Sequence, residues 1–150
     1  MQKHTKITKT LMLAAVLAAS VPVTAFAYER TPGAAAVPRL ESEKDCLRFD
    51  WGRATNRCDH TIRVTIAPTT SLTGTRAFHA NGLPNTECAG IALSNTAWKT
   101  SWTGRKFIYV GNASGADLGD ATIPSSGSYI FECDLTDDPD GSNLNSVTVF

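Results

Sequence analysis

Four cysteines constrain the fold of this chain more than any other feature of its sequence. They are Cys46, Cys58, Cys88 and Cys133, separated by 12, 30 and 45 residues. Zinc ligands usually come in close pairs, roughly two to four residues apart, and no such pair is present here. An even number of cysteines in a short exported chain is typical of a domain cross-linked by disulfides. We therefore expect two disulfides rather than a Cys₄ zinc site.

Four cysteines allow three pairings, and their spacing alone does not select one. We favour Cys46 with Cys58 and Cys88 with Cys133, because Asp50-Trp51-Gly52 suits a chain reversal that brings the first two opposite each other. Closing a loop of that size contributes about 3 kcal/mol of stability in the chain-entropy description.

The N-terminus has the pattern of a secretory signal peptide. Three lysines and no acid lie within the first nine residues, an apolar run follows over Leu11–Val23, and the segment closes with Ala25-Phe26-Ala27. A basic start, a short apolar run and an A-x-A site predict cleavage after Ala27. The run is too short to cross a hydrocarbon core of ~30 Å. We expect a secreted or periplasmic protein with no membrane span in the mature chain.

The charge of the mature chain argues against nucleic-acid binding. The full sequence has 14 basic and 14 acidic residues, and residues 1–27 contain three lysines and no acid. Their removal leaves 11 basic residues against 14 acids, a net charge of −3. The arginines are scattered rather than clustered, which disfavours a phosphate-binding surface.

The mature chain divides into a short lead-in and one domain. Residues 28–44 contain two prolines, a glycine and an alanine triplet, and we expect a flexible segment. Residues 45–150 show short alternating runs separated by Gly, Pro, Asn and Ser, without a sustained helical period. This texture predicts an all-β fold, a small antiparallel β-sandwich of seven or eight short strands.

Two runs carry the strongest strand patterns. Ile62, Val64 and Ile66 share one face of the run His60–Ala67, and alternate apolar residues share one face of Ser128–Leu135. The run Arg105–Gly111 is apolar on both faces, which predicts a central strand. Further strands are expected over the β-branched residues 145–150 and over the weaker runs Cys46–Asp50, Thr75–Ala80, Cys88–Leu93 and Ala97–Trp102.

No motif in the sequence indicates a catalytic site or a cofactor. There is no G-x-S-x-G motif, and the mature chain has only two histidines, His60 and His79, either of which could serve a small hydrolase. An acidic turn near the C-terminus offers a weak calcium candidate, but an EF-hand alignment lacks both key ligands. Its residues are Asp137, Asp138 and Asp140. We expect no cofactor and favour binding over catalysis.

Aromatic residues provide the main lead to a ligand. Trp98 and Trp102 are four residues apart, so on one strand they would share a face about 13 Å apart. Exposed, they would form a platform for stacking sugar rings, with Trp51 or Tyr109 as a third member. Buried, they would belong to the core, where large aromatics of small sandwiches usually lie.

The sequence therefore favours a non-catalytic binding module, with a glycan or a cell-envelope polymer as its ligand. One alternative is a secreted proteinaceous inhibitor or toxin-like factor that acts on a protein surface. Another is a structural surface subunit that associates by strand addition through residues 144–150.

Overall fold

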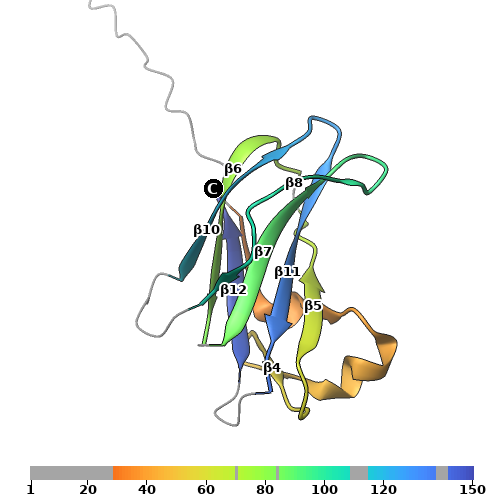
Figure 1. Cartoon of the computed structure of the whole chain (residues 1–150), viewed down its shortest axis with the longest axis vertical. Coiled ribbons are helices and arrows are strands. Elements are labelled where there is room, and N and C mark those ends of the chain that lie inside the picture. The colour runs from red at the N-terminus through yellow and green to blue at the C-terminus, as the bar shows by residue number, and fades with distance from the viewer. Residues whose placement is uncertain (1–28, 70, 84, 109–114, 138–141) are drawn as a thin grey trace, which may run out of the picture.

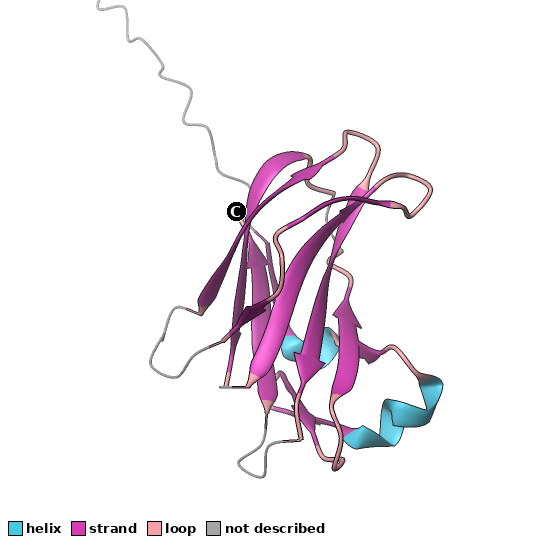
Figure 2. Cartoon of the chain, viewed as in Figure 1, coloured by secondary structure: helices cyan, strands magenta, loops and turns pink. Residues whose placement is uncertain are grey.

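A computed structural model describes residues 29–69, 71–83, 85–108, 115–137 and 142–150. The chain forms two antiparallel β-sheets that face each other, with short 3₁₀ helices between strands (Figures 1 and 2). This is the disulfide-bonded β-sandwich that the sequence predicts. Among the described residues, no helix is long and apolar enough to cross a membrane. The predicted signal peptide, residues 1–27, lies outside the described residues.

The strands are short, and the bounds of all elements are as follows. They are β1 (Glu29–Pro32), η1 (Gly33–Ala35), β2 (Val37–Pro38), η2 (Glu41–Cys46), β3 (Leu47–Asp50), β4 (Arg53–Asn56), β5 (Ile62–Ile66), β6 (Gly74–Gly82), β7 (Thr86–Leu93), β8 (Lys99–Trp102), β9 (Lys106–Phe107), β10 (Ala116–Ile123), β11 (Ser128–Leu135) and β12 (Asn143–Val149).

The first sheet, sheet A, has the order β10-β6-β12-β4-β3, and β1 also pairs with β12. Strand β12 is central, because β6 pairs along one edge while β4 and β1 share the other. The second sheet, sheet B, has the order β2-β5-β11-β7-β8, with β9 also paired to β7. Strand β10 contacts β7 and β8, so these edges of the two sheets lie together.

Alternation along the strands builds the core between the sheets. On β5 and β11 the apolar residues that the sequence placed on one face are buried, while their neighbours are partly exposed. The Phe78 ring of sheet A packs against Tyr129 and Phe131 of sheet B, with ring centroids 5.8 and 5.2 Å apart. Gly90 faces the Phe78 ring, and a Cβ at this position would lie 2.2 Å from it. Close packing therefore requires glycine there.

The two disulfides have the favoured pairing. Cys46 and Cys58 join the two ends of the β3–β4 hairpin, with Cα atoms 5.1 Å apart. Cys88 and Cys133 lie directly opposite each other on β7 and β11, with Cα atoms 4.1 Å apart, and both side chains are buried. Two disulfides and no free cysteine indicate an oxidising, extracytoplasmic location.

The lead-in expected to be flexible is instead part of the sandwich. Strand β1 pairs with β12, and β2 pairs with β5. The Tyr129 hydroxyl donates a hydrogen bond of 2.7 Å to the Glu29 carboxylate. Gly33 packs so closely on β12 that an added Cβ would clash with the carbonyl of Leu144. These contacts involve mainly the backbone, so the composition of the segment gave no sign of them.

The prediction of a central strand over Arg105–Gly111 is wrong for its described part. Only Lys106–Phe107 forms a strand, and it is exposed at the margin of sheet B. Apolar residues on both faces of this run do not reflect double burial, since Phe107 is exposed while Ile108 is buried. Strands β4 and β10 were not predicted, and in β10 a register shift beside Gly119, whose φ is +101°, interrupts the alternation.

Candidate functional site

The tip of the β3–β4 hairpin presents the most exposed large apolar side chain among the described residues. Asp50 pairs with Arg53, which leaves Trp51 and Gly52 as a two-residue loop. Their φ angles are +52° and +80°, as in the type I′ turns that suit the twist of antiparallel hairpins. The Trp51 side chain is 94% exposed, so the hairpin holds an indole ring out in solvent.

Tryptophan is an unfavourable residue for this turn. The first loop position of a type I′ turn usually holds Asn, Asp or Gly, because a bulky side chain is strained at positive φ. Such strain costs on the order of 1–3 kcal/mol, and it occurs most often at functional sites. Neither burial nor backbone preference accounts for Trp51 here. The exposed ring is therefore a candidate for contact with a ligand.

A hollow of about 290 Å³ lies next to the hairpin tip. The N–H of Ala34 donates to the carbonyl of Gly52 over 2.9 Å, which fixes the tip against the chain that follows β1. The walls of the hollow come from β1, the hairpin tip and β12. Its lining residues are Arg30, Pro32, Trp51, Gly52, Asn145 and Ser146.

Two polar side chains in this hollow keep hydrogen-bonding capacity free. Arg30 Nε donates to the Ser146 hydroxyl over 3.2 Å, and within the described residues its terminal nitrogens have no further partner. Asn145 donates from Nδ2 to Asn81 over 3.0 Å, whereas its buried Oδ1 accepts no hydrogen bond within the described part of the chain. Buried polar atoms without a partner are rare, and they call for an explanation.

The Trp51 hollow, as we call this site, therefore combines two kinds of contact. The indole gives a flat apolar surface and Arg30 gives charged donors, whereas the Asn145 oxygen is buried from solvent. Ligand sites in proteins typically pair apolar walls with a few convergent polar groups. Among the described residues, no acidic side chain lines the hollow. The arrangement suits a ligand that has both an apolar face and hydroxyl groups.

The predicted tryptophan pair is exposed, with fractions of 76% for Trp98 and 48% for Trp102. The core alternative of the sequence analysis therefore does not apply to them. Trp98 precedes β8 in the loop from β7, where its N–H and carbonyl both bond Ser94. Trp102 lies within β8, opposite Ile91 of β7.

The shared platform predicted for this pair has weaker support. A register shift lies between Ala92 and Leu93, opposite the stretch that separates the two tryptophans, so the simple alternation that would align them is interrupted. The ammonium of Lys99 lies 4.5 Å from the centroid of the Trp102 ring. This cation–π contact occupies the ring surface that stacking would need.

The structure does not bring Trp51 to this pair. Trp51 lies on the β3–β4 hairpin at one margin of sheet A, whereas β8 lies at the margin of sheet B that contacts β10. Tyr109 lies outside the described residues. Trp51 is therefore an exposed site separate from the Trp98 and Trp102 pair.

The calcium candidate is only partly visible. Asp137 is exposed, and Asp138 and Asp140 lie outside the described residues. One cluster of potential metal-ligand atoms in the described chain joins Cys46, Cys58 and His60 within 4.8 Å. Because these two cysteines are bonded to each other, neither offers a thiolate to a metal.

The two histidines lie apart, and each faces carboxylates. His60 lies 3.4 Å from Asp59 and 3.8 Å from Glu43. His79, on the outer face of sheet A, lies 3.8 Å from Asp117 and packs edge-to-face on Phe150. Neither ring makes a hydrogen bond to a Ser, Thr or Cys side chain within the described residues. The described geometry thus offers no nucleophile activated by histidine.

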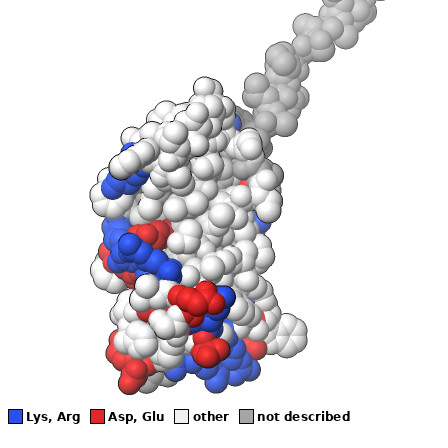
Figure 3. All heavy atoms as spheres, turned by 90° about the vertical axis from the view of Figure 1, so that its right-hand side faces the viewer, with Lys and Arg blue, Asp and Glu red and all other residues white. Residues whose placement is uncertain are grey.

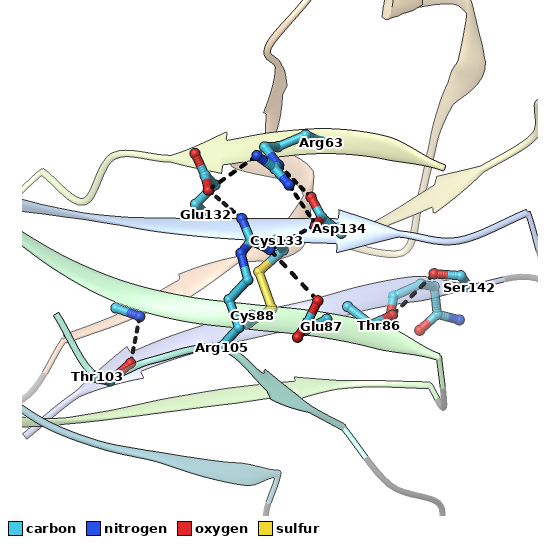
Figure 4. Close-up of a disulfide and its surroundings, with 12 residues drawn as sticks. Arg63, Thr86, Glu87, Cys88, Thr103, Arg105, Glu132, Cys133, Asp134 and Ser142 are labelled. Atoms are coloured by element: carbon cyan, nitrogen blue, oxygen red, sulfur yellow. Dashed lines mark hydrogen bonds and ion pairs between the residues drawn. A yellow bond between two sulfur atoms is a disulfide. The ribbon is translucent and has the colours of Figure 1, made fainter. Parts of the chain in front are cut away.

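A charged cluster covers part of the outer face of sheet B, on the side opposite the buried disulfide (Figure 4). Arg63 binds Asp134 through two hydrogen bonds of 2.6 and 2.9 Å, and Arg105 bonds the same carboxylate over 2.8 Å and also bonds Glu132. The hydrogen bond to Asp134 is the main cause that raises the pKa of Arg63 above its ordinary value. These groups satisfy one another, which is typical of a structural network.

Strand addition through residues 144–150 is disfavoured by their place in the sheet. Strand β12 already pairs with β6 along one edge and with β1 and β4 along the other. Its backbone groups are therefore engaged inside sheet A. A partner strand would have to displace one of these neighbours.

Sequence reasoning named Trp51 but missed the rest of the hollow beside it. Arg30 and Asn145 are 115 residues apart in the sequence, and only the pairing of β1 with β12 brings them together. Comparison with known proteins adds no relative: no protein-family model matches the chain, and no curated protein sequence matches it significantly.

Proposed function

We propose that this protein is a non-catalytic module that binds a glycan, and that the Trp51 hollow is its binding site. The observation that carries the proposal is the 94% exposed indole of Trp51, held on a turn with positive φ, beside the terminal nitrogens of Arg30, which have no partner among the described residues. A glycan of the cell envelope is accessible to a protein in the extracytoplasmic location that the disulfides support.

The chemistry of a sugar ring complements each part of the hollow. One face of a pyranose carries mainly C–H groups and can lie against an indole, whose ring face is electron-rich. The hydroxyl groups at the ring edge can accept hydrogen bonds from Arg30. Trp98, exposed on the opposite margin of the sandwich, offers a separate contact for a long polymer.

A glycan array followed by titration of the best ligand tests this proposal. The full chain, produced with both disulfides formed, is compared with Trp51→Ala and with the matched variant Trp98→Ala. Removing a stacking indole from a binding site typically costs 2 kcal/mol or more, so Trp51→Ala should weaken binding at least about thirtyfold. Trp98→Ala should retain most of the affinity for a short oligosaccharide.

An Arg30→Gln variant separates stacking from hydrogen bonding at the same site. Its affinity should fall about tenfold, because a charged donor to a hydroxyl is lost. Binding of no glycan on the array, or equal affinity of Trp51→Ala and the unchanged chain, would overturn the proposal.

A further inference from the structure

A second hollow, of about 380 Å³, lies between the segment that leads into η2 and the outer face of sheet B. The N–H of Arg39 donates to the carbonyl of Arg63 over 2.8 Å, which joins this segment to β5. In Figure 3, acidic and basic side chains are intermixed over the lower half of the visible face. The residues that line this hollow are Arg39, Leu40, Glu43, Thr61, Arg63 and Asp134.

The charges in this hollow are not equally engaged. Arg63 and Asp134 hold each other through two short hydrogen bonds. Within the described residues, the guanidinium of Arg39 makes no hydrogen bond or ion pair. Glu43 has a side chain only 12% exposed, and its nearest cationic partner is His60 at 3.8 Å. One free guanidinium and one weakly paired carboxylate therefore line the same cavity.

A largely buried carboxylate without a close partner is costly to keep desolvated. A ligand with a cationic group would supply the missing hydrogen bonds of Glu43, and an anionic group on the same ligand would engage Arg39 in a bidentate pair. The half-exposed side chain of Leu40 offers an apolar contact between charged walls. This pattern differs from the Trp51 hollow, since no aromatic residue of the described chain lines it.

The walls are held in place before any ligand arrives. Glu43 donates its N–H to the carbonyl of Leu40 over 3.0 Å, and the end of η2 is fixed by the Cys46–Cys58 disulfide. The other wall is the paired strands β5 and β11. Such preorganisation lowers the entropy cost of binding.

We propose that this hollow binds a short peptide by both of its charged ends, with Glu43 receiving the N-terminal ammonium group and Arg39 the C-terminal carboxylate. A purely anionic ligand such as phosphate fits less well, because Glu43 and Asp134 would repel it. A neutral sugar would leave both charges without an ionic partner.

The test is an NMR titration of the full, disulfide-bonded chain with the tripeptide Ala-Ala-Ala as the probe. N-acetylated and C-amidated trialanine serve as matched probes, each of which removes one charge. Shift changes are expected at the amides of Leu40, Glu43 and Thr61. Each capped peptide should bind about tenfold more weakly, since a charged hydrogen bond is lost.

Two variants assign the two charges, and three further variants serve as controls. Glu43→Gln should lower the affinity for the free tripeptide about tenfold, and it should bind the N-acetylated peptide as tightly as the unchanged chain does. Arg39→Gln should likewise lower the affinity for the free tripeptide and bind the C-amidated peptide as tightly as the unchanged chain does. Glu41→Gln and Arg48→Gln, exposed residues of the same types nearby that do not line the hollow, should bind normally. Trp51→Ala should also bind the tripeptide normally, which separates this site from the glycan site.

Equal affinity for free and capped peptides, or shift changes confined to other parts of the chain, would overturn the proposal. So would inorganic phosphate that produces the same shifts at comparable concentration, because the site would then recognise an anion only. Arg39 is exposed, and glutamine keeps the shape of glutamate at position 43, so both variants should fold. Circular dichroism of each variant checks its fold.

Discussion

Arg63 and Asp134 lie opposite each other on β5 and β11, and the guanidinium holds the carboxylate through Nε and Nη2 at 2.6 and 2.9 Å. Arg105 bonds one oxygen of the same carboxylate from the other side. A single aspartate therefore joins two arginines on the outer face of sheet B. It links β5 and β11 to the loop between β8 and β9.

The first prediction concerns this aspartate. Asp134→Asn removes the main partner of Arg63 and one of the two partners of Arg105, and should lower the free energy of unfolding by about 1–2 kcal/mol in urea denaturation. This loss is smaller than for a fully buried ion pair, because Arg63 is partly exposed and solvent screens its charge. An exposed control, Asp59→Asn, should change stability by less than about 0.5 kcal/mol.

The second prediction concerns pH. Because Asp134 raises the pKa of Arg63, the stabilisation from the charged guanidinium is fully present below the ordinary pKa of arginine and is lost only above the raised value. The stability difference between the unchanged chain and Arg63→Met should therefore stay constant from neutral pH to about pH 10. A difference that shrinks within this window would show that another group controls the pair.

The third prediction concerns the strained turn. Trp51→Asn should stabilise the hairpin by about 1 kcal/mol, because asparagine tolerates positive φ where tryptophan does not. Thermal unfolding measures the gain. The same variant should lose glycan binding, so stability and binding would change in opposite directions. A variant less stable than the unchanged chain would show that the indole supports the fold.

The fourth prediction concerns Gly90. A Cβ at this position would lie 2.2 Å from the Phe78 ring, so Gly90→Ala should destabilise the protein by about 1–3 kcal/mol. The double variant Gly90→Ala/Phe78→Ala removes Cγ and Cδ1 of residue 78, the two atoms that the added methyl group would approach most closely. The loss of free energy of unfolding in the double variant should be smaller than the sum of the losses in the two single variants, as a double-mutant cycle measures.

The fifth prediction ranks the disulfides. In the chain-entropy description, replacing Cys88 and Cys133 by alanine opens a loop of 45 residues and costs about 4 kcal/mol. Replacing Cys46 and Cys58 opens a loop of 12 residues and costs about 3 kcal/mol. Chemical denaturation of the two double variants checks the order, and the reverse order would contradict it.

The sequence predicted those parts of the fold whose pattern is local. Alternation on β5 and β11 gave both the strands and their buried faces, since each strand has one face in the core. The reversal at Asp50-Trp51-Gly52 gave the first disulfide. Strand β1 was missed because it pairs with β12 through its backbone, which leaves no pattern in its side chains.

The candidate sites were predictable only in part, for a related reason. The sequence shows that residue 51 is a tryptophan, but its exposure depends on the turn that holds it. Arg30 meets Asn145, and Arg39 meets Asp134, through strand pairings between distant segments. Such pairings follow from the global register of the sheets, and no local spacing encodes them.

Each disulfide connects strands of a single sheet, since Cys46–Cys58 closes the β3–β4 hairpin of sheet A and Cys88–Cys133 joins β7 to β11 in sheet B. The sulfur bridges therefore do not fasten one layer of the sandwich to the other. The layers adhere through apolar contacts such as those of Phe78, and denaturants that weaken these contacts should part them while every sulfur bond stays intact. Each disulfide strengthens one sheet, whereas apolar packing and a few hydrogen bonds, such as those of Tyr129 with Glu29 and Asn56 with Leu135, hold the two sheets together.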